Sequence, residues 1–214
     1  MIDIDPKEVA RYLSYRGQQP DETVRALIEE CIAEVNAAAD PKFTCGRFSL
    51  TWSEEQGFQA ASLRFNSLSL QCNLAGCREV FLFAATLGIA VDTLIRRSAM
   101  LDAAKGLVMQ AAAAAAIEAF CDSENDKLRD QVESEGLYLR PRFSPGYGDL
   151  SLDVQRDFLR VLQAQKAIGL TLTDSGMMVP IKSVTALIGI SDVPTSCHRQ
   201  GCEVCERLDC AFHR

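Results

Sequence analysis

The first forty residues carry the hydrophobic pattern of two helices. Asp5 and Pro6 predict where the first begins, since aspartate caps free N–H groups and proline suits the first helical position. We expect this helix to end near Gly17. The second is expected to begin near Asp21 and to stop before Pro41. Its apolar residues recur on one helical face: Val24, Leu27, Ile28, Cys31, Ile32 and Val35.

From Lys42 to Trp52 the pattern changes to the period of two that is typical of a half-buried strand. Phe58 to Phe65 is expected to form its partner strand. Residues 79–86 are a nearly continuous apolar run, which indicates a strand buried on both faces. Further short strand candidates lie at 170–173, 177–179 and 183–190.

Two more helices are expected over 89–101 and 103–121, the second rich in alanine, and a polar stretch follows over 122–136. Residues 137–149 have strand character and then turn residues, and Ser151 can cap another helix. Its expected inner face carries Val154, Phe158, Leu159 and Leu162.

Helices and strands are thus interspersed without a regular βαβ rhythm. This order favours an α+β fold with a mixed or antiparallel sheet over 1–192, followed by a cysteine-rich tail over 193–214.

Composition and charge narrow the class of protein. The 214 residues include 48% apolar and 24% charged residues, which is ordinary for a globular chain. A net charge of −7 disfavours nucleic acid and anionic membranes as partners. Residues 1–6 do not have the pattern of a signal peptide, and the alanine-rich stretch 106–120 is too short to span a bilayer. We therefore expect a cytoplasmic protein.

Common catalytic and nucleotide-binding motifs are missing from the sequence. Both histidines lie in the tail, so the main body offers no Ser-His-Asp or Cys-His set. It also has neither a Walker A sequence nor a G-x-G-x-x-G after a strand.

The tail holds four of the nine cysteines in a short segment: Cys197, Cys202, Cys205 and Cys210. Thiolates that converge around a C-x-x-C centre suit tetrahedral zinc or an iron–sulfur cluster. The spacing fits the usual template of neither, so zinc, an iron–sulfur cluster and free thiols all stay open. The other five cysteines are expected to be small core residues.

The segment from Arg140 to Asp149 is the most informative loop. Proline and glycine at Pro145 and Gly146 allow a sharp turn, Arg142 offers a planar fork for a carboxylate, and Tyr147 offers a ring and a hydroxyl. By spacing alone, a tight surface turn with an exposed arginine explains the same residues.

A series of short motifs resembles the activation domain of cobalamin-dependent methionine synthase. In order they are Arg142-Phe143-Ser144-Pro145-Gly146-Tyr147, Ile168-Gly169, Leu172-Thr173-Asp174-Ser175, Met178 with Pro180, and Ser183-Val184. The resemblance covers about residues 118–190 and is weaker through 78–117. Asp174 replaces the family's glutamate, and the family's paired tyrosines after the last strand have no counterpart, which affects the adenosine part of the site.

This resemblance implies that the chain binds S-adenosylmethionine. By the same correspondence, Arg142, Gly146 and Tyr147 match ligand-binding positions, Ser144 supplies a main-chain contact, and Glu118 meets polar or cationic ligand groups. The family also has an N-terminal aspartate at the ligand, for which Asp3, Asp5 and Asp21 are the candidates.

The family's role implies a partner. We expect a free-standing component of methionine synthase activity that supplies S-adenosylmethionine for the reductive methylation of oxidised cobalamin. The cobalamin would be carried by a methionine synthase that lacks its own activation domain, with flavodoxin or ferredoxin as electron donor. Two alternatives are an iron–sulfur reductive activator of corrinoid proteins and a non-catalytic interaction module with the same fold.

Overall fold

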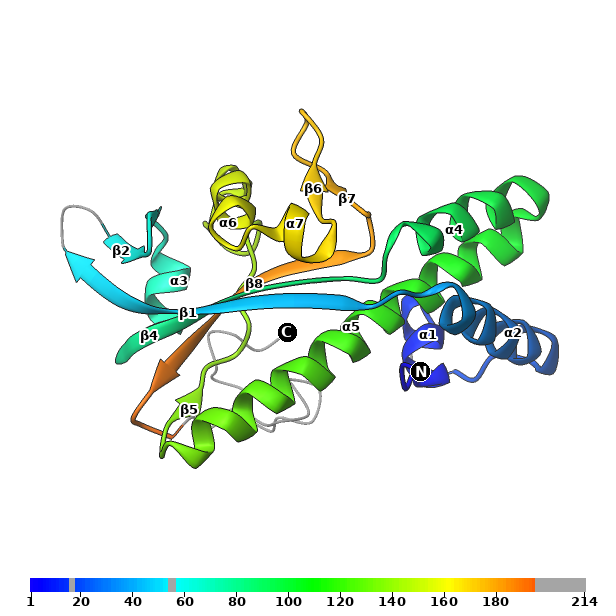
Figure 1. The fold of residues 1–214 in the computed structure, drawn as a ribbon. Coiled ribbons are helices and arrows are strands. Elements are labelled where there is room, and N and C mark those ends of the chain that lie inside the picture. The colour runs from blue at the N-terminus through cyan, green and yellow to red at the C-terminus, as the bar shows by residue number, and fades with distance from the viewer. Residues whose placement is uncertain (16–17, 54–56, 195–214) are drawn as a thin grey trace.

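An antiparallel sheet forms the centre of the computed structural model, which describes residues 1–15, 18–53 and 57–194 (Figure 1). Its six strands lie in the order β3-β2-β1-β4-β8-β5, and every neighbouring pair is antiparallel. Their bounds are β1 (Lys42–Ser53), β2 (Gly57–Ala60), β3 (Leu63–Phe65), β4 (Cys77–Thr86), β5 (Tyr138–Leu139) and β8 (Ser183–Ser191). β6 (Thr171–Leu172) and β7 (Met178–Val179) form a separate hairpin. The predicted α+β class is confirmed, and of the two predicted sheet types the antiparallel one is present.

Helices cover both faces of this sheet. One face packs against α1 (Pro6–Tyr12), α2 (Glu22–Ala38), α4 (Ile89–Leu101) and α5 (Ala103–Ser134). The other packs against α3 (Leu68–Asn73), the 3-10 turn η1 (Leu152–Val154), α6 (Gln155–Val161) and α7 (Ala164–Ile168). The chain therefore has one hydrophobic core on each side of the sheet.

Strand β4 is buried on both faces, as its continuous apolar run predicted. Alternate side chains enter different cores, because successive residues of a strand point to opposite faces. Phe81, Phe83 and Ala85 pack with the α1–α2–α4–α5 layer, whereas Val80, Leu82 and Ala84 pack with the α3–α6–α7 layer.

The two N-terminal helices begin at the predicted caps. The carboxylate of Asp5 accepts a hydrogen bond from the backbone N–H of Lys7 at 2.8 Å, and that of Asp21 accepts one from Val24 at 2.9 Å. The first helix ends at Tyr12 and not near Gly17, because Ser14 adopts a left-handed backbone with φ 70° that a helix cannot continue through.

Helix α5 is longer than the sequence pattern predicted. It continues from the expected end at residue 121 to Ser134 through a polar stretch. Buried residues still recur there at helical spacing: Cys121, Asn125, Leu128 and Val132. The prediction ended the helix too early because polar residues occupy part of the buried face.

The length and composition of α5 would also allow it to cross a membrane, although 56% of its most apolar stretch is buried inside the molecule. A single helix of this kind is weak evidence for a membrane span, since core helices share its composition.

Two other local predictions were wrong in part, and two short helices were missed. The strand expected over 58–65 is the hairpin β2–β3, which turns at Ala61 with φ 51°. Helices α3 and α7 were not predicted. In the segment 137–149 only Tyr138–Leu139 forms a strand, and the following residues run irregularly beside β8.

Candidate functional site

The direction of the Arg142 side chain is set by the edge of the sheet. Phe143 exchanges two backbone hydrogen bonds with Leu187 of β8, at 2.9 and 2.8 Å. Successive side chains of an extended segment alternate in direction. Phe143 accordingly enters the core beneath α6 and α7, while Arg142 reaches helix α5 on the other face of the sheet.

Arg142 lies between two carboxylates of α5. Its guanidinium donates to Asp122 Oδ1 at 2.7 Å and to Glu118 Oε2 at 3.1 Å. Glu118 and Asp122 are four residues apart and therefore lie on the same helical face. The side chain of Arg142 is 19% exposed, against 47% and 68% for Glu118 and Asp122. The cation is thus the more buried member of this cluster, which we call the Arg142 cluster.

The charges of the Arg142 cluster favour a cationic ligand. Burial lowers the pKa of the Arg142 guanidinium, but the surrounding negative charges, Asp122 first, outweigh burial and raise the pKa. One cation and two carboxylates give a formal sum of +1 − 2 = −1. A positive group is therefore attracted to the exposed carboxylates, while the guanidinium is already fixed in place.

The loop after Arg142 is closed by its own backbone. The N–H groups of Gly146 and Tyr147 donate to the carbonyls of Leu150 and Ser144, at 2.8 and 3.1 Å. Gly146 has φ 91° and Gly148 has φ 54°, which glycine adopts without strain. Pro145 is buried, Ser144 is half-buried, and the Tyr147 ring is exposed. The loop therefore presents Tyr147 from a constrained turn.

Asp149 fixes the far end of this loop to helix α3. Its carboxylate accepts hydrogen bonds from the backbone N–H groups of Leu68 at 2.7 Å and Ser69 at 3.1 Å, and from the Ser67 hydroxyl. These bonds, that of Ser67 first, hold the pKa of the Asp149 carboxyl well below its usual range. The sequence offered no signal for this contact, because its partners are about 80 positions away.

Tyr12 is a neighbour of the cluster that sequence reasoning missed. Its partly exposed ring lies 5.0 Å from the Arg11 guanidinium, and its pKa is raised by partial burial and then by the Glu118 carboxylate. The end of α1 thus comes near Glu118. Of the predicted N-terminal aspartates, Asp5 and Asp21 use their carboxylates to cap helices.

The structure therefore brings Glu118 and Arg142 together and places Ser144, Gly146 and Tyr147 in the loop that follows. Whether these five residues bind a ligand stays a prediction. The proposed metal ligands Cys197, Cys202, Cys205 and Cys210 lie outside the described residues. Within 1–15, 18–53 and 57–194, no three histidine, cysteine or acidic side chains are grouped as a metal site.

The core prediction for the remaining cysteines is confirmed for two of them. Cys31 and Cys121 are buried, and burial raises their pKa to about 11 and about 12. Cys45 and Cys77 are intermediate, whereas Cys72 is exposed, so the prediction was wrong for Cys72.

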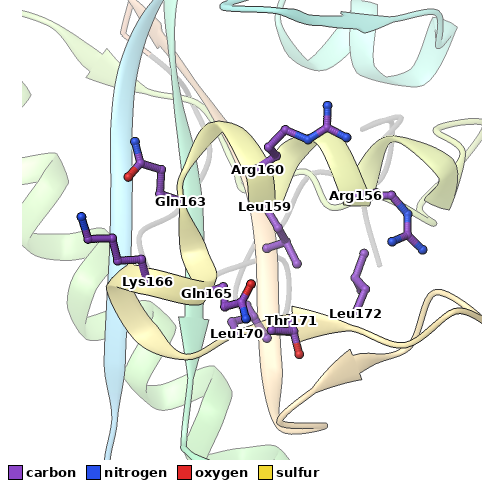
Figure 2. Close-up of a pocket in the computed structure, with 9 residues that line it drawn as sticks. All are labelled: Arg156, Leu159, Arg160, Gln163, Gln165, Lys166, Leu170, Thr171 and Leu172. Atoms are coloured by element: carbon purple, nitrogen blue, oxygen red, sulfur yellow. The ribbon is translucent and has the colours of Figure 1, made fainter.

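A hollow of about 700 Å³ lies away from this cluster, beside α6, α7 and β6 (Figure 2). Neither this hollow nor a smaller one of about 300 Å³ on α4 is lined by any of the five predicted site residues.

Comparisons with known proteins agree with this fold. The family model described as "Vitamin B12 dependent methionine synthase, activation domain" matches residues 75–195, more than half of the chain. A solved structure, "Crystal Structure of the MetH Reactivation Domain bound to AdoHcy", is similar with a TM-score of 0.63 and 18% sequence identity. The match covers 87% of this chain and 73% of that chain, and at this identity it shows the fold alone. No curated protein sequence matches. The chain belongs to the family of vitamin B12-dependent methionine synthase activation domains.

Proposed function

We propose that the chain binds S-adenosylmethionine at the Arg142 cluster and the loop up to Tyr147, and that it supports the reductive methylation of cobalamin. Family membership supports this role. The similar solved domain is described as bound to AdoHcy, which is S-adenosylmethionine without the transferred methyl group. The observation that carries the proposal is the guanidinium of Arg142 held between Glu118 and Asp122, three positions before Pro145 in the chain.

The arrangement suits the charges of this ligand. Its sulfonium and ammonium groups are positive and are attracted to the exposed carboxylates of Glu118 and Asp122. Its carboxylate suits the planar fork of Arg142, which would exchange one of its present partners for the ligand. The Tyr147 ring offers an electron-rich face to a sulfonium. These residues bind and orient the ligand, and they carry out no acid–base step.

Binding is also expected to distinguish reactant from product. A reduced cobalamin on the partner would supply the electron pair for the methyl group. The C–S bond of the bound ligand would then break, and its sulfonium would become a neutral thioether. The net negative cluster attracts that sulfonium more strongly than the neutral product. The chain's contribution is orientation of the methyl group, which lowers the entropic part of the barrier.

Calorimetric titration with S-adenosylmethionine tests the site. Arg142→Ala should weaken binding by about 2 kcal/mol, roughly 30-fold, because a charge-assisted contact is lost. Arg78→Ala is the matched control, since Arg78 is largely exposed and its one ion pair among the described residues is with Asp192 at 3.4 Å. Equal affinities of the two variants would place the ligand elsewhere, and no binding by the unaltered chain would reject the function.

The identity of the partner is part of the same proposal. We expect a cobalamin-carrying methionine synthase without its own activation domain, with flavodoxin or ferredoxin as electron donor, in the cytoplasm. Mixing the purified components should restore methylcobalamin only when the chain, S-adenosylmethionine and the donor are all present. Recovery at the same rate without the chain would contradict the proposed role.

The alternative function, an iron–sulfur reductive activator of corrinoid proteins, depends on the cysteines of the tail. Anaerobic purification followed by assay of iron, sulfide and zinc separates zinc from a cluster at Cys197, Cys202, Cys205 and Cys210. A metal-free chain with four reactive thiols would remove both metal predictions.

A further inference from the structure

The hollow beside α6, α7 and β6 is a separate feature from the Arg142 cluster. Its lining residues are Arg156, Leu159, Arg160, Gln163, Gln165, Lys166, Leu170, Thr171 and Leu172. They belong to the layer on one face of the sheet, whereas Arg142 contacts α5 on the other face. The proposed S-adenosylmethionine site therefore does not use it.

The lining is basic although the chain is acidic. Three of the nine lining residues are cationic and none is acidic, in a chain of net charge −7. Arg160 pairs with Asp157 at 3.0 Å. Among the described residues, no carboxylate forms an ion pair with Arg156 or Lys166. The hollow thus concentrates positive charge, and two of its three cations have no ion-pair partner in the described part of the chain.

The floor of the hollow is apolar. Leu159 and Leu170 are buried, and Leu172 is half-buried. Figure 2 shows the Arg156 side chain on the side of Leu172, with Gln165 beside Thr171. The Arg160 side chain extends away from these residues, and the side chains of Gln163 and Lys166 lie at the opposite end of the lining from Arg156. A guanidinium next to an apolar floor suits a ligand that has an anionic group on an apolar body.

Gln163 adds a second observation from the backbone. It joins α6 to α7 in a left-handed conformation, with φ 49° and ψ 38°. Glycine would adopt this conformation without strain, yet this position carries a side chain that lines the hollow. Strained residues of this kind cluster at ligand sites.

We infer that the hollow lined by Arg156, Gln163 and Lys166 binds a small organic anion, with a phosphate or carboxylate at Arg156 and an apolar or aromatic body on Leu159 and Leu172. This inference does not depend on the proposed methylation role. The guanidinium of Arg156 provides two parallel N–H donors, and a phosphate or a carboxylate can accept hydrogen bonds from both of them. Lys166 adds charge without a fixed geometry.

The test is an NMR titration of the ¹⁵N-labelled chain with four probes: phenyl phosphate, phenylacetate, inorganic phosphate and benzyl alcohol. We expect at least one aromatic anion to shift amide signals clustered over 156–172, and to bind about fivefold or more tightly than inorganic phosphate or benzyl alcohol. The stronger of the two aromatic anions identifies the anionic group. Shifts spread over the whole surface, or equal binding of benzyl alcohol, would overturn the inference.

Two arginine variants sharpen the test. Arg156→Ala should weaken binding of the stronger aromatic anion about tenfold. Arg160→Ala removes the same charge from the same helix but should change affinity less than about twofold, because Arg160 pairs with Asp157. Equal losses would show attraction to general positive charge and would overturn a specific site.

Gln163→Gly separates the side chain from the backbone. It should raise the melting temperature, since the strain is relieved, and weaken binding about threefold, since the amide is lost. Binding that stays unchanged would remove Gln163 from the site. If poly-glutamate binds over 156–172 while neither aromatic anion does, the hollow is a protein-binding surface and the small-ligand assignment fails.

Discussion

The cations on the two faces of the sheet differ in whether they are paired with carboxylates. On the α5 face, Arg142 is largely buried and already paired with Glu118 and Asp122. On the α6–α7 face, the cations around the hollow stand over an apolar floor, and Arg156 and Lys166 have no ion pair among the described residues. A ligand that binds Arg142 on the α5 face must displace a carboxylate that is already paired with it. An anion that binds on the α6–α7 face displaces no such partner from Arg156 or Lys166 among the described residues. A cation that is already paired therefore helps to orient a ligand and to select among ligands, whereas an unpaired cation mainly attracts anionic ligands.

Phe143 joins these two faces, and removing its ring should have the largest effect. Its side chain is 8% exposed and packs in the α6–α7 core, while its backbone fixes the neighbouring Arg142. Phe143→Ala should lower the free energy of unfolding by about 3 kcal/mol, measured by urea denaturation. The control is Phe43→Ala, which should cost clearly less because Phe43 is 37% exposed. Equal costs would mean that Phe143 does not anchor the two faces.

Gly148→Ala should distort the loop that connects Arg142 to helix α3. The added methyl group would lie 2.6 Å from Ser69 Oγ, at a residue with φ 54°. We expect a loss of about 2 kcal/mol in unfolding free energy and weaker S-adenosylmethionine binding. Gly136→Ala, at φ 74° with no atom within 4 Å of the new methyl group, has only the backbone strain of about 1 kcal/mol. If Gly148→Ala weakens aromatic-anion binding over 156–172 as much as it weakens S-adenosylmethionine binding, the two sites are not independent.

Glu118→Gln tests whether net charge determines ligand choice on the α5 face. The formal sum of the Arg142 cluster rises from −1 to 0. Affinity for S-adenosylmethionine should fall about three- to fivefold, as expected for a partly exposed charge, while affinity for AdoHcy should change less. Competition calorimetry with both ligands measures the difference. A parallel loss of both affinities would show that Glu118 contacts a part common to the two ligands.

Asp149→Asn should have the smallest effect at neutral pH and the clearest dependence on pH. Because the folded pKa of this carboxyl is lowered, its stabilising contribution is present above the unfolded value of about 3.9 and is lost as the pH falls through the folded value. The variant should melt at a lower temperature at neutral pH, and the gap should narrow on acidification. Melting curves from pH 7 to pH 3 measure this difference in melting temperature. A difference that stays constant with pH would contradict the lowered pKa of Asp149.

Local patterns predicted the elements that local forces control. The apolar run of β4 predicted burial on both faces, and Asp5 and Asp21 predicted two helix starts. The order of short motifs from Arg142 to Val184 predicted the family. Each of these rests on residues close together in the chain, where spacing and backbone chemistry are sufficient evidence.

The candidate site shows where such reasoning stops. The expected end of α5 at residue 121 left Asp122 outside any helix, so its pairing with Arg142 was missed although it lies four residues after Glu118. Tyr12 was missed because its approach to Glu118 depends on the packing of α1. No family motif pointed to the hollow at Arg156.

The sequence by itself determined the fold class, the family and the loop that carries Arg142, because periodicity, caps and motif order are properties of neighbouring residues. Only the tertiary structure decided which charges meet: among the described residues Arg142 has ion-pair partners and Arg156 has none. Those outcomes depend on how α5, α6 and the edge of β8 lie relative to one another. Electrostatic energy falls with distance between atoms and takes no account of their separation along the chain.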